Sequence, residues 1–189
     1  AKTVIENEAK GVASMGRIIG ESSFISAAEV IYQTNGTVIV TGIGKAGIIA
    51  NKISATLAST GTPSHFLHPA EAVHGDLGKI RPGDTVLALS HSGESDELIR
   101  LINQIKQQEA KLISITGDEE SRLAQYSDIV LCMGSLSEAC PLGIAPSVST
   151  TCMLALGDSL AFTVMKARNF DAEDYARFHP AGALGAKLI

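Results

Sequence analysis

The segment TVLALSHSGES, residues 85–95, carries the clearest structural signal in the chain. Residues 85–89 are apolar or β-branched, as in an inner strand, and an amphipathic helical pattern follows at 97–105. A hydroxyl-rich loop between a strand and a helix favours phosphate binding, because the helix start offers free N–H groups and the positive end of its dipole. An ordinary N-cap is the alternative, but one serine would satisfy it. Three serines around Gly93, which allows close backbone approach, favour the anion site.

Composition limits the classes of protein that the chain can represent. Its 189 residues are 45% hydrophobic and carry a net charge of −5, which predicts one folded domain and argues against nucleic-acid or anionic-membrane partners. No apolar run approaches twenty residues, so we expect no membrane span, and the polar N-terminus has no signal-peptide core. Cys132, Cys140 and Cys152 lack C-x-x-C spacing, which predicts free thiols in a reducing cytoplasm.

The order of the predicted elements indicates the fold class. Helical spacing of apolar residues occurs at 3–20 and 23–34, before the first strand. We then expect strands at 37–43, 64–68, 85–89, 111–116 and 128–132, separated by helices at 45–59, 69–77, 97–109 and 121–126, with a last helix at 147–167. This alternation predicts an α/β, three-layer αβα sandwich with a five-stranded parallel sheet, flavodoxin-like, with N-terminal helices added. We assign one domain, 1–189, comprising N-terminal helices (1–35), an α/β core (36–170) and a C-terminal tail (171–189).

Three loops should meet at one crevice. In sheets of this kind ligands lie beyond the carboxyl ends of the strands, where the strand order reverses. The loops that begin near residues 42, 90 and 138 all follow predicted strands. We therefore expect residues 42–45, 90–95 and 138–146 to face the same ligand.

Gly42, Gly44 and Gly47 match the pattern G-x-G-x-x-G between a strand and a helix, which raises a dinucleotide site as an alternative. That fingerprint also requires an acidic residue at the end of the next strand, and residues 64–68 contain none. Lys45 within the motif suits a compact phosphorylated ligand better. A Walker A loop is excluded by its spacing, and the glycines also serve a tight strand–helix turn.

Two carboxylates are candidates for proton transfer. Glu138 lies in the mostly apolar segment EACPLG, where a charge is costly without a task, so we expect a functional group with a raised pKa. Glu97 falls in the first turn of the helix after the serine loop, where a carboxylate often only complements the helix dipole.

The histidines are weaker candidates. His74, in HGDLG, and His179, in the glycine-rich tail, fit a structural or exposed role better than catalysis on the sequence alone. A metal site built from His65, His68, His74 and Asp76 is a further alternative, but the spacing matches no strong ligand motif. We therefore predict no metal.

Several segments together carry a family resemblance. The loop at 90–95 resembles the phosphate loop of SIS domains, the sugar-isomerase fold. GIGK, ASTGTP, HGDLG, EACPLG, the segment 145–151 and HPAGALG (residues 179–185) are similar to the D-arabinose 5-phosphate isomerases within that group. The resemblance runs from residue 38 to the end.

This resemblance implies an aldose–ketose isomerase that interconverts D-ribulose 5-phosphate and D-arabinose 5-phosphate for synthesis of Kdo, an acidic sugar of Gram-negative lipopolysaccharide and capsule. It places catalysis on Lys45, Glu97, Glu138 and His179. No cofactor is expected. Contacts with the sugar phosphate fall on these residues: Ser90, His91, Ser92, Ser95, Gly44, Thr60 and His74.

The resemblance also implies a homotetramer with a shared active site, into which the tail with His179 would reach from a neighbour. The chain departs from the family by having Ala46 where members often have serine, and by stopping before the pair of CBS modules that many members carry. A non-catalytic SIS sensor of sugar phosphates, or an isomerase of another sugar phosphate, remains an alternative function.

Overall fold

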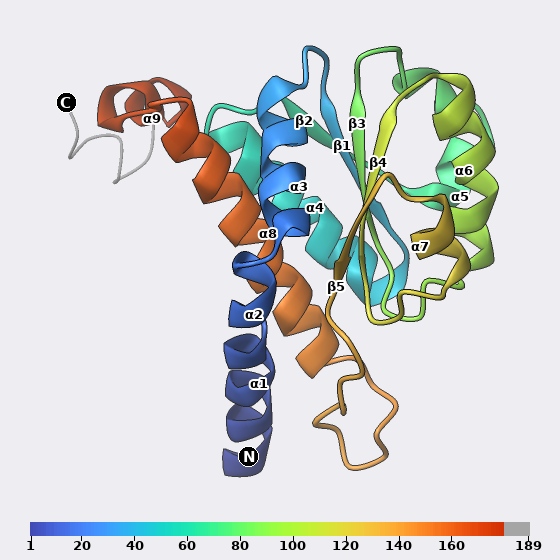
Figure 1. The fold of residues 1–189 in the computed structure, drawn as a ribbon, viewed down its shortest axis with the longest axis vertical. Coiled ribbons are helices and arrows are strands. Elements are labelled where there is room, and N and C mark those ends of the chain that lie inside the picture. The colour runs from blue at the N-terminus through green and yellow to red at the C-terminus, as the bar shows by residue number, and fades with distance from the viewer. Residues whose placement is uncertain (180–189) are drawn as a thin grey trace.

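Five parallel strands form one sheet at the centre of the computed structural model, which describes residues 1–179 (Figure 1). The strands are β1 (Val38–Gly42), β2 (Ser64–Leu67), β3 (Thr85–Leu89), β4 (Lys111–Thr116) and β5 (Ile129–Cys132). Their order across the sheet is β2-β1-β3-β4-β5. All four pairings are parallel, as the alternation of strands and helices predicts.

Helices cover both faces of the sheet (Figure 1). One layer contains α3 (Ser22–Gln33), α4 (Gly44–Ser59) and α8 (Val148–Ala167), with α1 (Lys2–Ser14) and α2 (Gly16–Ile19) at its outer end. The other layer contains α5 (Pro69–Ala72), the 3-10 turn η1 (Asp76–Lys79), α6 (Asp96–Gln107) and α7 (Arg122–Tyr126). The predicted three-layer αβα fold is confirmed.

The two faces of the sheet bury alternate residues, because successive strand side chains point in opposite directions. Val38 and Val40 pack in the core under α3, α4 and α8, whereas Ile39 between them packs in the core under α6. Both cores contain fully buried side chains from the central strands, so the inner strands read as continuous apolar runs.

The strand order reverses between β1 and β3. The helix after β1, α4, lies on one face, and the helix after β3, α6, lies on the other. The two helix starts therefore diverge at the carboxyl edge of the sheet and leave a crevice between them.

The helices differ from the prediction at three places. The helix expected at 3–20 is interrupted at Met15, and the helix expected at 69–77 is divided into α5 and η1, separated by Gly75 with φ +129°. The tail from 170 contains a helix that the sequence pattern does not predict, α9 (Ala172–Phe178). The Asp171 side chain accepts hydrogen bonds from backbone N–H groups of this helix, and the Asp174 side chain accepts one from Asp171 N, so a capping box stabilises it.

The helix α8 is long and apolar enough, by length and composition, to cross a membrane, although no span was expected. Half of that segment is buried in the fold, against α1, α3 and α4. The central helix of a folded domain can be equally long and apolar, because neighbouring elements pack against it on several sides.

Candidate active site

A pocket of about 260 Å³ lies at the carboxyl edge of the sheet, where three helices begin. Its walls come from the end of β1 and the start of α4, from the loop between β3 and α6, and from the start of α8. The lining residues are Ile43, Lys45, Ala46, Leu89, Ser90, His91, Ser92, Ser95, Pro146, Ser149, Thr150 and Met153. Three helix N-termini thus point their partial positive charge toward one small space.

The serine loop, residues 90–95, is held in shape by its own hydroxyls. Ser90 Oγ accepts a hydrogen bond from Gly93 N at 3.1 Å and lies 3.2 Å from Ser95 Oγ, while Ser92 Oγ accepts from Glu94 N at 3.2 Å. Gly93 has φ +65°, and a Cβ there would clash with the side chain of Ser121. The turn therefore requires glycine, and it presents Ser90, Ser92 and Ser95 to the pocket.

Three glycines allow the tight turn at the start of α4. A Cβ on Gly47 would lie 2.6 Å from the carbonyl oxygen of Gly42, and one on Gly42 would lie 3.1 Å from Leu89 O. Gly44, with φ +60°, begins the helix next to Lys45. The G-x-G-x-x-G pattern is thus explained by close packing of strand and helix, which places the exposed Lys45 at the pocket.

Glu138 binds the start of α8 beside the pocket. Its Oε2 accepts hydrogen bonds from Ser147 N at 2.7 Å and Ser147 Oγ at 3.1 Å, and Ser149 Oγ donates to Oε1. Ser149 lines the pocket and Glu138 does not, so the hydroxyl of Ser149 lies between the half-buried carboxylate and the pocket. The serine loop and Glu138 are therefore brought to the same edge of the molecule.

The expected direction of the Glu138 pKa is wrong. Burial raises the pKa of this carboxyl, but the hydrogen bonds from Ser149 and Ser147 favour the charged form and together hold the pKa below its usual value. The charge of Glu138 also acts on the neighbouring Cys152. Burial, followed by the negative charges of Glu138 and Glu8, raises the pKa of the Cys152 thiol to about 11. Glu138 is therefore ionised at neutral pH.

Hydrogen bonds to the Cys140 thiol stabilise the loop before α8. The Sγ of Cys140 accepts hydrogen bonds from Ile144 N and Ala145 N, both at 3.1 Å, and these bonds lower the pKa of the thiol. Cys132 and Cys152 are also free thiols, as the sequence predicts.

Three other predicted site residues are not among those that line this pocket. Glu97 is exposed in the first turn of α6, and His74 is exposed after α5. Thr60 is buried at the end of α4 opposite to Lys45, where its hydroxyl donates to Thr56 O at 2.7 Å. The structure therefore separates Thr60 from the pocket of its own chain.

Helix α9 lies at the C-terminal end of α8 (Figure 1), and His179 follows α9, whereas Glu138 binds the opposite end of α8. The His179 ring stacks on Tyr175 at 4.0 Å, and its Nδ1 lies 2.9 Å from Tyr175 O. The 20 residues of α8 span about 30 Å, so His179 is remote from the pocket of its own chain. The rest of the HPAGALG segment, residues 180–185, lies outside the described residues.

The histidines considered for a metal site have other surroundings. His68 Nδ1 accepts from Ala70 N as the cap of α5, and burial lowers the pKa of His65. Within residues 1–179 we find no group of three or more His, Cys, Asp or Glu side chains placed to hold a metal ion.

The start of α8 contributes two pocket residues to which the sequence pattern alone assigned no role. Ser149 and Thr150 line the pocket, next to Pro146, which belongs to the loop 138–146 that was expected to face the ligand. Their segment has several hydroxyls at a helix start, as the serine loop does, and only the family resemblance singled it out.

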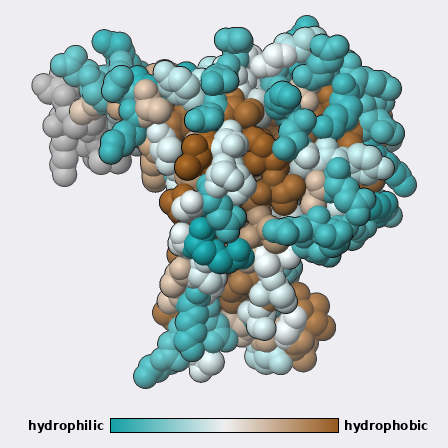
Figure 2. Space-filling model, viewed as in Figure 1, coloured by the Kyte–Doolittle hydropathy of each residue, from teal (hydrophilic) through white to brown (hydrophobic). Residues whose placement is uncertain are grey.

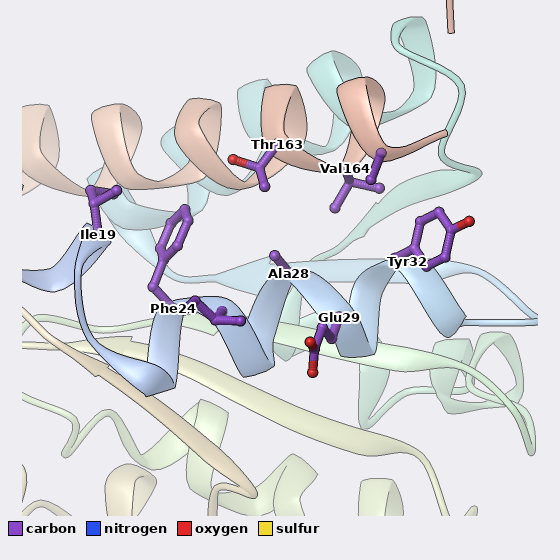
Figure 3. A pocket seen from close by; sticks show the side chains of 9 residues that line it. Ile19, Phe24, Ala28, Glu29, Tyr32, Thr163 and Val164 are labelled. Carbon is purple, nitrogen blue, oxygen red and sulfur yellow. The ribbon is translucent and has the colours of Figure 1, made fainter. Parts of the chain in front are cut away.

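A larger cavity of about 420 Å³ lies elsewhere, between α3 and α8 (Figure 3). Phe24, Ala28 and Val164 form its base, and the partly exposed side chains of Ile25 and Tyr32 form its rim. We call this cavity the α3/α8 groove. Glu29 is its one charged lining residue among those described, and with Tyr32 and Thr163 it offers few polar groups to fix the orientation of a small polar ligand.

Residues 30–163 match the SIS domain, and the chain belongs to this family. It is 50% identical to the arabinose 5-phosphate isomerase KdsD of Yersinia pestis over 188 residues, a match that covers 100% of this chain and 57% of that relative. The chain thus spans little more than half the length of the curated relatives that it matches.

Solved structures agree with this assignment. The c3406 protein of E. coli CFT073 in complex with arabinose 5-phosphate has a TM-score of 0.88 at 39% identity, over 95% of each chain. The Vibrio vulnificus NanR protein complexed with ManNAc-6P has a TM-score of 0.81 at 16% identity, over 96% of this chain and 69% of that one. The second likeness shows the fold alone.

Proposed function

We propose that this chain is the isomerase domain of an arabinose 5-phosphate isomerase, which interconverts D-ribulose 5-phosphate and D-arabinose 5-phosphate. The observation that carries the proposal is the shared location of the serine loop, Lys45 and Glu138 at one pocket. The identity to KdsD across the whole chain, and the sugar-phosphate complex of the E. coli relative, support the choice of sugar. The product would serve Kdo synthesis for lipopolysaccharide or capsule.

Phosphate binding is assigned to the serine loop. Hydroxyls of Ser90, Ser92 and Ser95 and the free N–H groups at the start of α6 suit a dianion without placing a fixed charge beside it. His91 belongs to this loop and lines the pocket, and Gly44 is the first residue of α4. Binding the phosphate would hold the reacting carbons in position, which converts binding energy into rate.

Proton transfer is assigned to Glu138. Isomerisation moves a hydrogen between C1 and C2, so a base removes the proton beside the carbonyl, and an enediolate forms. An ionised carboxylate is in the correct state to accept that proton, although its lowered pKa makes it a weaker base. Lys45 and the three helix N-termini would stabilise the negative oxygen of the enediolate. This chemistry needs no cofactor.

Glu97 and His179 have secondary roles in the proposal. Glu97 would orient Lys45 or assist proton transfer once substrate is bound, and His179 would open the sugar ring or move a proton between oxygens. Because His179 is about one length of α8 from its own pocket, roughly 30 Å, we assign it to the pocket of a neighbouring subunit. His74 and Thr60 would contact substrate only in such a shared site.

A homotetramer would bring these groups together. The α3/α8 groove (Figure 3) is an exposed apolar surface that supports this assembly. Its lining residues Ile25 and Tyr32 are each about half exposed, as is Phe162 elsewhere on α8. Figure 2 shows further hydrophobic surface at the loop after β5, where Leu142 and Ile144 are 79% and 76% exposed. Contact between copies would cover such surface.

Mixing two inactive variants tests the shared site. Glu138→Gln and His179→Ala homomers should each lose activity. After dissociation and reassembly together, a fraction of the sites would contain both native groups, and activity should return. Failure to recover activity, with mixed oligomers present by mass spectrometry, would contradict the shared site.

A deuterium-exchange assay tests the reaction itself. The protein is incubated with ribulose 5-phosphate in D₂O, and the arabinose 5-phosphate product is examined for deuterium at C2. Binding without exchange would favour a sugar-phosphate sensor, the alternative function. Exchange with another sugar phosphate only would indicate a different isomerase. We place the reaction in the cytoplasm, where the three free thiols would stay reduced.

A further inference from the structure

Ser149 connects the carboxylate of Glu138 to the pocket. Its side chain is only 1% exposed, it lines the pocket, and its hydroxyl donates to Glu138 Oε1. The Ser149 N–H also approaches Oε2, at 3.4 Å. Ser149 therefore contacts both oxygens of the carboxylate and the space assigned to substrate.

Ser147 binds the same carboxylate but in a different way. Its Oγ accepts from Ala139 N at 3.0 Å, and its N–H and hydroxyl both hold Oε2. Ser147 thus fixes the loop to the start of α8, and the hydroxyl of Ser149 is the partner of Oε1. Among the described residues, the Ser149 hydroxyl is the one donor to Oε1, and it is also the donor that lines the pocket.

We propose that Ser149 is a positioning residue for Glu138: its hydroxyl holds the carboxylate beside the pocket in the orientation that the reaction requires. This proposal rests on the proposed function, in which Glu138 is the base that removes a proton from the sugar. Cys152 on α8 and Glu8 on α1 are ionisable groups near the carboxylate, and Glu8 Oε2 lies 3.5 Å from Thr151 Oγ1. Lys45 lines the same pocket as Ser149. The hydrogen bonds from Ser149 and Ser147 are what lower the pKa of Glu138, against the effect of burial.

Ser149→Ala is the direct test, with Ser149→Thr as the variant that restores a hydroxyl. Loss of a hydrogen bond to a charged group predicts a fall in kcat of roughly 10- to 100-fold with little change in KM. The acid limb of the pH profile should move to higher pH, because the carboxylate must be ionised to act and its pKa rises without the donor. Ser149→Thr should recover most of both effects.

Ser159→Ala is the matched control, since Ser159 is also on α8 and its hydroxyl donates to Ala155 O, away from Glu138. It should leave kcat and the pH profile unchanged. If Ser149→Ala lowers activity equally at every pH, or if the pH profile moves as much in the control, Ser149 does not position Glu138.

A measurement without turnover separates this proposal from the proposed function. NMR of protein labelled with ¹³C-glutamate, assigned by comparison with Glu138→Gln, follows the titration of the Glu138 carboxyl directly. Its midpoint should rise in Ser149→Ala and return in Ser149→Thr. An unchanged midpoint overturns the role of Ser149, whereas a raised midpoint in a protein that catalyses no exchange overturns only the isomerase assignment.

Discussion

The pocket at the carboxyl edge of the sheet and the α3/α8 groove differ in both size and chemistry. The pocket is the smaller, about 260 Å³ against 420 Å³, yet it gathers a lysine, five hydroxyl side chains and three helix N-termini. The groove is larger and almost wholly apolar. A sugar phosphate requires donors for its oxygens, whereas an apolar helix of another subunit requires none. Chemistry, and not cavity volume, therefore separates the ligand site from the assembly surface.

The largest expected effect comes from removing the base. Glu138→Gln retains the shape of the side chain but cannot accept the carbon-bound proton, so kcat should fall about 10²- to 10⁴-fold. Binding of arabinose 5-phosphate, measured by calorimetry, should stay near the wild-type value. Near-normal turnover in this variant would remove Glu138 from the mechanism.

Removing the cation of the pocket should have the next largest effect. Lys45→Met keeps the length of the side chain and loses its charge, which weakens stabilisation of the developing oxyanion. We expect kcat/KM to fall roughly 100-fold, by analogy with the loss of one oxyanion donor. The partly exposed Lys52 on the same helix pairs with Asp158, and Lys52→Met is the control that should change kcat/KM little. Equal losses in both variants would contradict the role of Lys45.

The groove is tested by placing a charge in it. Ile25→Asp puts a carboxylate where the assembly would bury an apolar side chain, and because Ile25 is 53% exposed, the subunit should still fold. Sedimentation should then show smaller species with reduced activity. The control is Glu29→Gln on the same helix, which removes an exposed charge without adding one and should assemble normally. An active wild-type monomer would contradict the whole assembly proposal.

The smallest effect concerns stability of the serine loop. Gly93→Ala introduces a Cβ at φ +65°, against the side chain of Ser121, and should lower the free energy of unfolding by about 1–3 kcal/mol. Gly143 also has a positive φ, +65°, but its Cβ would meet nothing within 4 Å. Gly143→Ala should therefore cost less in thermal or denaturant unfolding, and a reversed order would show that contact with Ser121 does not constrain the loop.

Local sequence patterns predict the sheet and the serine loop well. The strands at 85–89 and 111–116 have the predicted bounds, because short runs rich in apolar and β-branched residues between turn residues suit buried parallel strands. The serine loop after β3 is predicted in the same way, because an apolar strand, several hydroxyl residues and a helix follow one another directly in the chain. These features depend on residues that are neighbours in the chain.

Features that depend on distant residues are not visible in such patterns. The lowered pKa of Glu138 arises from Ser147 and Ser149, which approach it only when α8 begins beside the loop. Thr60 belongs to a family motif, but the sequence does not reveal that it closes the far end of α4. The helix α9 is short and depends on a capping box, so it has little apolar periodicity to detect.

A crystal structure with arabinose 5-phosphate tests the central claim most directly. We predict that the phosphate lies within hydrogen-bond distance of the serine loop, with the sugar carbons between Lys45 and the start of α8, and that the α3/α8 groove holds no sugar phosphate. A phosphate bound in the groove, or at an edge of the sheet remote from Ser92, would contradict the account.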